Sequence, residues 1–412
     1  MEKEGCVREM KSGKMIRLMV MMFIQNMMFP VWFTTVCPYV STLSEDSLWV
    51  VLCGLLIGIG MLASPVVCMV ADRFLDSVKV LALCNLLSAG ALAVAALMTD
   101  PAWIYSCLVV VTVFQMPTWS VAAAIAMAHA PTRSFPYIRA CGSIGWACSA
   151  VISVVAIKFF GIADFERSNL IFWAGAAVAL MGAVIALMMP STPPKAKGTP
   201  MSVADALGLR ALVLLKDRQF CILSGVLLLA MIPLQWYMNY CSVYLDEVKF
   251  TYLSATYNLG TAAELGFMLL LPLMFKKMSF KSIMLIGLGA LVFRYACFSA
   301  AAISGIRAFD LGAILIHGLI FGIVIVGVQL HAAELAPPEL RNQAQGYVMT
   351  LSAGVGNLLS VALFGFLVLP LFKVSDKQHD WTVPYLISFG LAVLAMILFA
   401  VLYKAPKKLD NK

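Results

Sequence analysis

Glu264 is the residue whose setting most strongly suggests chemistry. It lies in the apolar run 259–272, within a segment, 252–275, that is long enough to cross a bilayer. A charged side chain at bilayer depth costs at least about 2.5 kcal/mol, so such residues normally face a polar pathway. Glu264 is therefore expected to bind substrate or to carry a proton, and the alternative is a structural ion pair with Arg294.

A cation, a hydroxyl and an indole fall on one face of another apolar segment. Arg139, Ser143 and Trp146 follow the spacing i, i+4, i+7. A guanidinium can fork onto a pair of oxygens, and an indole can stack on a sugar or base ring. The face predicts a ligand site, unless Arg139 only extends to the membrane interface. Gly142 and Gly145 lie on a different face and predict close helix packing.

Amides and aromatics in two further segments could belong to the same site. Gln235 and Asn239 are one turn apart and follow a proline, which predicts a bend beside a cavity. An interhelical hydrogen bond is the alternative for Gln235. Gln25 and Trp32 share a face with Phe29, and this stripe either contacts ligand or packs helices.

Other titratable residues suggest proton transfer and gating. His317 lies in an apolar segment, where a histidine could relay a proton or could form an interhelical hydrogen bond. His317 is therefore a second candidate for proton coupling. Gating ion pairs are expected from charged residues in two predicted cytoplasmic loops: Asp72 with Arg73, and Glu339 with Arg341.

These residues have to be held by membrane-spanning helices. The chain is 62% hydrophobic and 12% charged, whereas soluble domains are about 25% charged. The apolar runs predict twelve spans: 15–40, 47–70, 78–99, 102–128, 138–161, 168–190, 219–245, 252–275, 281–303, 308–334, 343–371 and 382–404.

The distribution of charge tests this arrangement. The amino terminus, the loops after even-numbered spans and the tail are basic, while the opposite loops are acidic or mixed. By the positive-inside rule both termini are cytoplasmic. The net charge of +8 is therefore attributed to membrane topology, and no nucleic-acid partner is expected.

The expected fold is an all-α membrane protein with twelve transmembrane helices in two six-helix bundles. A long polar stretch divides the spans six and six. The predicted parts are an N-terminal lobe (1–190), a cytoplasmic inter-lobe loop (191–218), a C-terminal lobe (219–404) and a cytoplasmic tail (405–412).

The chain resembles the major facilitator superfamily and, within it, the nucleoside:proton symporter family. The resemblance runs along nearly the whole chain and rests on these stretches: Gln25 with 32–35, 70–73, 116–118, 139–146, 207–216, 234–235, Glu264 with Pro272, 293–294 and 341–346. It implies that Arg139, Ser143, Trp146, Gln235 and Glu264 fall on the family's ligand residues.

Other positions depart from the family pattern. The resemblance places a family asparagine at Met238, a glutamine at Thr261, a tyrosine at His317 and an acid at Gly322. The stretch around Trp146 is also similar to the lactose permease branch, in which a tryptophan lies under the sugar ring.

The function expected from this resemblance is proton-coupled uptake of nucleosides by alternating access, in the bacterial cytoplasmic membrane. The alternatives are a proton-coupled sugar or oligosaccharide symporter and a non-transporting sensor or degenerate paralogue, which the missing acid at Gly322 suggests. The expected partners are a nucleoside or sugar, a proton and the lipid bilayer. We expect a monomer that is not an enzyme and has no cofactor or metal.

Overall fold

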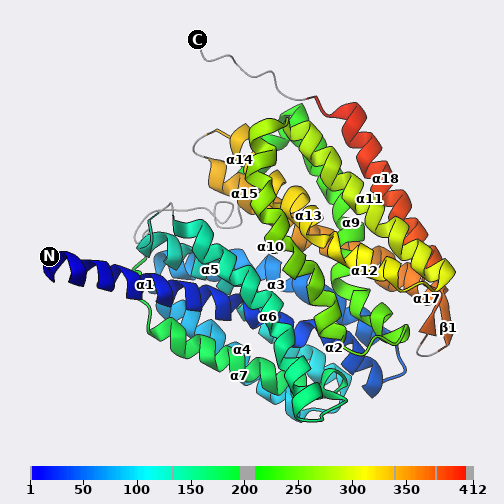
Figure 1. The fold of residues 1–412 in the computed structure, drawn as a ribbon, viewed down its shortest axis with the longest axis horizontal. Helices are drawn as coiled ribbons and strands as arrows, with labels where there is room; N and C mark the ends of the chain where they lie inside the picture. Colours follow the sequence, from blue (N-terminus) through cyan, green and yellow to red (C-terminus); the bar gives the residue numbers. More distant parts are fainter. Residues whose placement is uncertain (1, 132–133, 195–208, 338–339, 376–377, 405–412) are drawn as a thin grey trace. The chain divides into compact units, whose positions relative to one another are not determined.

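Helices dominate the described chain (Figure 1). The structure is a computed structural model that describes residues 2–131, 134–194, 209–337, 340–375 and 378–404. Within these residues, eleven helical segments are long and apolar enough to cross a membrane. Helix α10, which carries Glu264, is a further helix of 25 residues. The count of twelve spans stays a prediction.

The elements follow one another in this order: α1 (Glu2–Met27), α2 (Pro30–Leu43), α3 (Leu48–Arg73), α4 (Ser77–Leu97), α5 (Pro101–His129), α6 (Phe135–Phe159), η2 (Phe165–Arg167), α7 (Leu170–Leu187), η3 (Leu209–Lys216), α9 (Arg218–Glu247), α10 (Leu253–Lys277), α11 (Phe280–Ser304), α12 (Ala308–Leu315), α13 (His317–Ile320), η4 (Phe321–Gly327), α14 (Val328–Leu335), α15 (Arg341–Met349), η6 (Thr350–Val355), α16 (Gly356–Ser360), η7 (Val361–Val368), α17 (Leu369–Leu371), β1 (Lys373–Ser375), β2 (Gln378–His379) and α18 (Thr382–Leu402).

The chain divides into two compact units. The first unit contains Met1–Ser202 and Asn239–Ala262, and the second contains Val203–Met238 and Ala263–Lys412. Helices α9 and α10 therefore each contribute one part to each unit. The predicted inter-lobe loop, 191–218, lies largely outside the described residues, and its role as a boundary stays a prediction.

In the first unit, the first long helical segment is broken between α1 and α2. Pro30 begins α2, where its missing N–H is tolerated because the first turn of a helix has no intrahelical acceptor for it. Helix α6 packs closely on α1, since a Cβ at Gly145 would overlap the backbone carbonyl of Phe23. The close packing expected of Gly142 and Gly145 is confirmed, and it fixes Arg139 and Trp146 beside α1.

In the second unit, two long helical segments contain π-helical stretches. The segments are Ala308–Leu335 and Gln343–Leu371, and the stretches are η4, η6 and η7. A π turn shifts backbone hydrogen bonds by one residue and is frequent at functional sites. Stretch η4 directly follows α13, which begins with His317, and η6 contains Ser352, whose carbonyl accepts from Gln235.

Candidate functional site

An aromatic cluster occupies the interior of the first unit. Phe29, at the break between α1 and α2, has its ring centroid 5.2 Å from Trp32, 5.8 Å from Trp119 and 6.0 Å from Trp146. Trp119 and Trp146 are 5.8 Å apart. These distances are typical of interacting aromatic pairs. One residue from the α1–α2 break and one each from α2, α5 and α6 therefore form a set, which we call the aromatic cluster: Phe29, Trp32, Trp119 and Trp146.

Arg139 lies one helical turn before Ser143 and two turns before Trp146 on α6. The place that a Cβ would take at Gly142 is 3.0 Å from Arg139 Nη1 and 2.7 Å from Asn26 Nδ2. The guanidinium thus reaches along α6 towards Trp146, whereas a side chain extending to the interface would reach towards the start of the helix. Ser143, on the same face, is buried. Arg139 itself is exposed, and its place in a ligand site stays a prediction.

Trp119 is a member of the cluster that sequence reasoning missed. It lies one turn after Gln115 on α5, and that spacing is the signal that could have revealed it. Gln115 is fully buried, and its Oε1 accepts a hydrogen bond from Trp32 Nε1 (3.2 Å). The pairing joins α2 to α5 and fixes the plane of the Trp32 indole.

Gln25 faces a different part of the first unit. The place of a Cβ at Gly182 on α7 is 3.1 Å from Gln25 Nε2 and 3.0 Å from Asn85 Nδ2 on α4. Gln25 is fully buried there. The structure therefore places the Gln25 amide against α4 and α7, while Asn26 lies beside Arg139.

A buried cation lies at the centre of the second unit. Arg294 on α11 is 0% exposed and donates from Nη2 to His317 Nδ1 (2.8 Å) and from Nε to the carbonyl of Ala313 (3.2 Å). Its Cζ lies 4.1 Å from the ring centroid of Tyr237 on α9, a cation–π distance. We call these three side chains the arginine cluster: Tyr237, Arg294 and His317.

The hydrogen bond to Arg294 determines the protonation of His317. A guanidinium can only donate, so Nδ1 of His317 must accept, and the ring proton of the neutral imidazole lies on Nε2. Protonating the ring would break this bond and set two cations side by side. His317 is thus held neutral while Arg294 is in place.

Glu264 lies directly against the helix that carries His317. It is 6% exposed, and a Cβ at Gly318 would overlap the Cα and backbone nitrogen of Glu264. Only glycine permits this approach of α13 to α10. The contact brings Glu264 next to Gly318, which follows His317 in the chain; a site shared by Glu264 and His317 stays a prediction. A Cβ at Gly322, in η4, would meet no described atom within 4 Å.

The side-chain amide of Gln235 forms a hydrogen bond within the protein through its nitrogen only, among the described residues. Its Nε2 donates to the carbonyl of Ser352 in η6 (3.2 Å), and its buried Oε1 accepts no hydrogen bond from the described residues. The interhelical bond is therefore present and leaves an acceptor for a ligand. Asn239, one turn later, belongs to the first unit, where its carbonyl accepts from Cys37 Sγ (3.8 Å).

The expected gating residues lie at helix ends. Asp72 and Arg73 end α3, and Arg341 begins α15. Glu339 lies outside the described residues.

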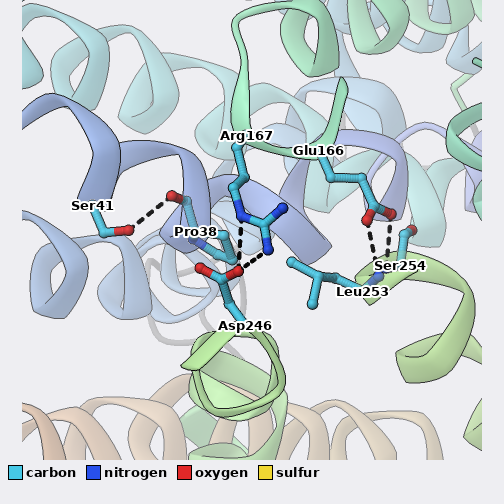
Figure 2. Close-up of polar contacts among 7 residues, drawn as sticks. All are labelled: Pro38, Ser41, Glu166, Arg167, Asp246, Leu253 and Ser254. Atoms are coloured by element: carbon cyan, nitrogen blue, oxygen red, sulfur yellow. Dashed lines mark hydrogen bonds and ion pairs between the residues drawn. The ribbon is translucent and has the colours of Figure 1, made fainter. Parts of the chain in front are cut away.

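A polar clamp joins the α6–α7 connection to the parts of α9 and α10 that belong to the first unit (Figure 2). Glu166 is buried and accepts from the backbone N–H groups of Leu253 (2.8 Å) and Ser254 (2.9 Å), at the first turn of α10. Arg167 donates from Nε to Asp246 Oδ1 (2.8 Å), near the end of α9. A carboxylate at a helix N-terminus satisfies donors that the helix leaves unpaired and complements its dipole.

Removing the Glu166 carboxylate should destabilise the first unit. In Glu166→Ala, two buried N–H groups lose a charged acceptor, at a cost of about 2–3 kcal/mol. The expected result is a lower melting temperature of the purified protein. The control is Asp164→Ala, which removes an exposed acid from the same connection and should leave the melting temperature unchanged. Equal melting temperatures for both variants would contradict the role of Glu166.

The chain is similar to known proteins along nearly its whole length. The model of the family described as "Nucleoside H+ symporter" matches residues 12–408. YegT of Escherichia coli (strain K12) is 32% identical over 405 residues, covering 94% of this chain and 93% of YegT. The xanthosine permease of the same strain is 26% identical over 420 residues, covering 96% and 98%.

Two solved structures show the fold. The nucleoside transporter NupG superposes with a TM-score of 0.82 at 22% identity, covering 95% of this chain and 99% of that chain. A D-xylose–proton symporter gives a TM-score of 0.72 at 13% identity, covering 96% and 99%. The expected all-α fold of major facilitator transporters is confirmed by these superpositions. The arrangement of twelve helices in two six-helix bundles stays a prediction.

Proposed function

Because the chain belongs to the nucleoside H+ symporter family, we propose that it takes up nucleosides together with protons by alternating access. The observation that carries the proposal is the position of Glu264, a buried acid at the α10–α13 contact beside a histidine held neutral. A carboxyl group in such a place can exchange a proton when water or substrate reaches it, since its charge is costly at this depth.

The two proton candidates receive different roles. Glu264 takes and releases the transported proton, and in its ionised form it accepts hydrogen bonds from substrate hydroxyls. His317 stays neutral because Arg294 occupies its Nδ1, so it contributes through its Nε2–H donor. Gln235 adds an acceptor, Oε1.

In the first unit, the substrate is held by the aromatic cluster and the face of α6 that precedes it. Trp146 and Trp32 supply flat apolar surfaces, and Ser143 supplies a hydroxyl. Arg139 donates to oxygens of the substrate as a planar fork. Gln25 and Asn239 are assigned to support of these residues, since both are buried among other helices.

Arg139→Ala tests the assignment of this arginine. Losing a charged donor to a ligand costs about 1.5–3 kcal/mol, so uridine should bind about 10- to 100-fold more weakly. Arg139→Lys keeps the charge without the fork and should fall between Arg139→Ala and the unchanged protein. The measurement is equilibrium binding of radiolabelled uridine to purified protein. Unchanged affinity in Arg139→Ala would remove Arg139 from the site.

The remaining features follow from the same proposal. The chain forms twelve spans in two six-helix lobes, has both termini in the cytoplasm of a bacterium and works as a monomer in the inner membrane. The charged residues at the ends of α3 and α15, Asp72, Arg73 and Arg341, pair as gates together with Glu339. The clamp of Figure 2 fixes parts of α9 and α10 in one state of the cycle.

A proton-coupled sugar symporter is the second candidate, because Trp146 lies in an aromatic cluster of the kind that can stack on a sugar ring. Thermal-shift measurements separate the two. A ligand at about 100 times its Kd stabilises the folded state by about 2.7 kcal/mol. Stabilisation by nucleosides and not by mono- or disaccharides supports the proposal. The reverse pattern favours a sugar symporter. Nucleoside binding without counterflow would indicate a non-transporting sensor.

A further inference from the structure

We propose that the aromatic cluster selects nucleosides whose base carries ring carbonyls, such as uridine and inosine, over those with an amino group at the same position, such as cytidine and adenosine. The inference rests on the proposed function and identifies the preferred substrate class of that site. Trp119 and Trp146 are the residues that determine the preference.

The cluster contains hydrogen-bond donors that the described residues leave unused. Nε1 of Trp119, Nε1 of Trp146 and Nε2 of Gln115 are buried, and none donates a hydrogen bond within the described part of the chain. Gln115 as a whole is 0% exposed. Buried donors without acceptors are rare in folded proteins and call for a partner. Two of them in the aromatic cluster, and a third on Gln115 next to it, indicate a ligand that brings acceptors.

The two indoles offer no acceptor in return. An indole has one N–H and only donates. The acceptor of Gln115, Oε1, already receives the N–H of Trp32 at 3.2 Å. Arg139, which reaches along α6 towards Trp146, is also donor-only. A ligand edge that faces the N–H groups of Trp119 and Trp146 therefore gains hydrogen bonds through carbonyl oxygens and gains none through amino groups.

Nucleobases differ in whether they present a carbonyl or an amino group at the same ring position. Uracil and hypoxanthine present a carbonyl where cytosine and adenine present an amino group, and the paired bases have almost the same shape. Trp119 and Trp146 are each partly exposed as residues, and a flat base that stacks on an indole can accept its N–H through a carbonyl. An amino group at that position would face a donor and leave it unpaired. A site built to hydrogen-bond one group rejects the analogue that lacks it.

The experiment uses purified full-length protein and two matched pairs of ligands. Unlabelled uridine, cytidine, inosine and adenosine each compete with radiolabelled uridine for binding. The affinity for uridine is compared with that for cytidine, and the affinity for inosine with that for adenosine. The unchanged protein is expected to bind uridine and inosine at least about tenfold more tightly than their amino counterparts. Trp119→Phe and Trp146→Phe keep an aromatic ring and remove the N–H, and each should reduce the uridine-to-cytidine ratio at least about threefold. Trp173→Phe, outside the cluster on α7, should leave the ratio unchanged.

The outcomes separate this inference from the proposed function. If nucleosides bind but the ratio of affinities for uridine and cytidine is near one, the inference is overturned and the proposed function stands. The same holds if that ratio is unchanged in both Trp119→Phe and Trp146→Phe. Either variant suffices for the test if the other does not fold. If none of the four nucleosides binds, both the proposed function and the inference fail.

Discussion

Glu264→Gln is expected to lower uridine uptake driven by a pH gradient by about 100-fold or more. Glutamine keeps the shape of the side chain and its place at the α10–α13 contact, but it cannot carry a proton. Exchange of labelled for unlabelled uridine across the membrane requires no net proton movement, so it should be reduced much less. The measurement is uptake and counterflow by the variant in proteoliposomes.

The matched control is Glu45→Gln, which changes an exposed acid between α2 and α3 and should leave both activities unchanged. Uptake by Glu264→Gln that still follows the pH gradient would show that the proton is carried elsewhere. Loss of uptake and exchange together would make Glu264 a binding residue without a specific role in coupling.

Arg294→Met is expected to lower uptake by about tenfold or more and to change its dependence on pH. Methionine has a similar length but provides neither charge nor donors, so His317 loses the group that occupies its Nδ1. Without that donor, Nδ1 of His317 is free to take up a proton, which adds a second proton-binding group close to Glu264. The measurement is initial uptake rate between about pH 5 and 8.

A second substitution identifies the group responsible. Arg294→Met combined with His317→Gln should lose the additional pH dependence, because glutamine does not titrate. Arg294→Lys keeps the charge and one donor, and it should resemble the unchanged protein in pH dependence. An identical pH profile for Arg294→Met and the unchanged protein would mean that Arg294 does not control His317.

Helix positions are largely predictable from this sequence, because an apolar run of spanning length is bounded by recognisable residues. The predicted spans 78–99 and 102–128 correspond to α4 (Ser77–Leu97) and α5 (Pro101–His129). Asp100 accepts from Ala102 N (2.8 Å) and Pro101 follows it at the first helical position, so α5 starts where capping chemistry requires.

The interior of the helices is less predictable. The π-helical stretches η4, η6 and η7 lie in apolar, glycine-containing sequence that hydropathy cannot distinguish from ordinary helix. The carbonyl of Ser352, which pairs with Gln235, belongs to one of these stretches.

Partners across helices could not be derived from spacing alone. Periodicity placed Gln25, Phe29 and Trp32 on one face, yet Gln25 lies against α4 and α7 while Phe29 contacts Trp119 and Trp146. The helix face that periodicity predicts covers a wide arc, so residues on the same predicted face can contact different neighbouring helices. The pairing of Arg294 with His317 likewise depends on which helices meet, because the two residues are 23 positions apart.

Uridine uptake by purified protein in liposomes, with and without a pH gradient, tests the central claim most directly. An inwardly directed proton gradient should drive accumulation of labelled uridine above its outside concentration, and a protonophore should abolish the accumulation. Uridine that only equilibrates across the membrane, at the same rate with and without the gradient, would contradict proton-coupled nucleoside uptake.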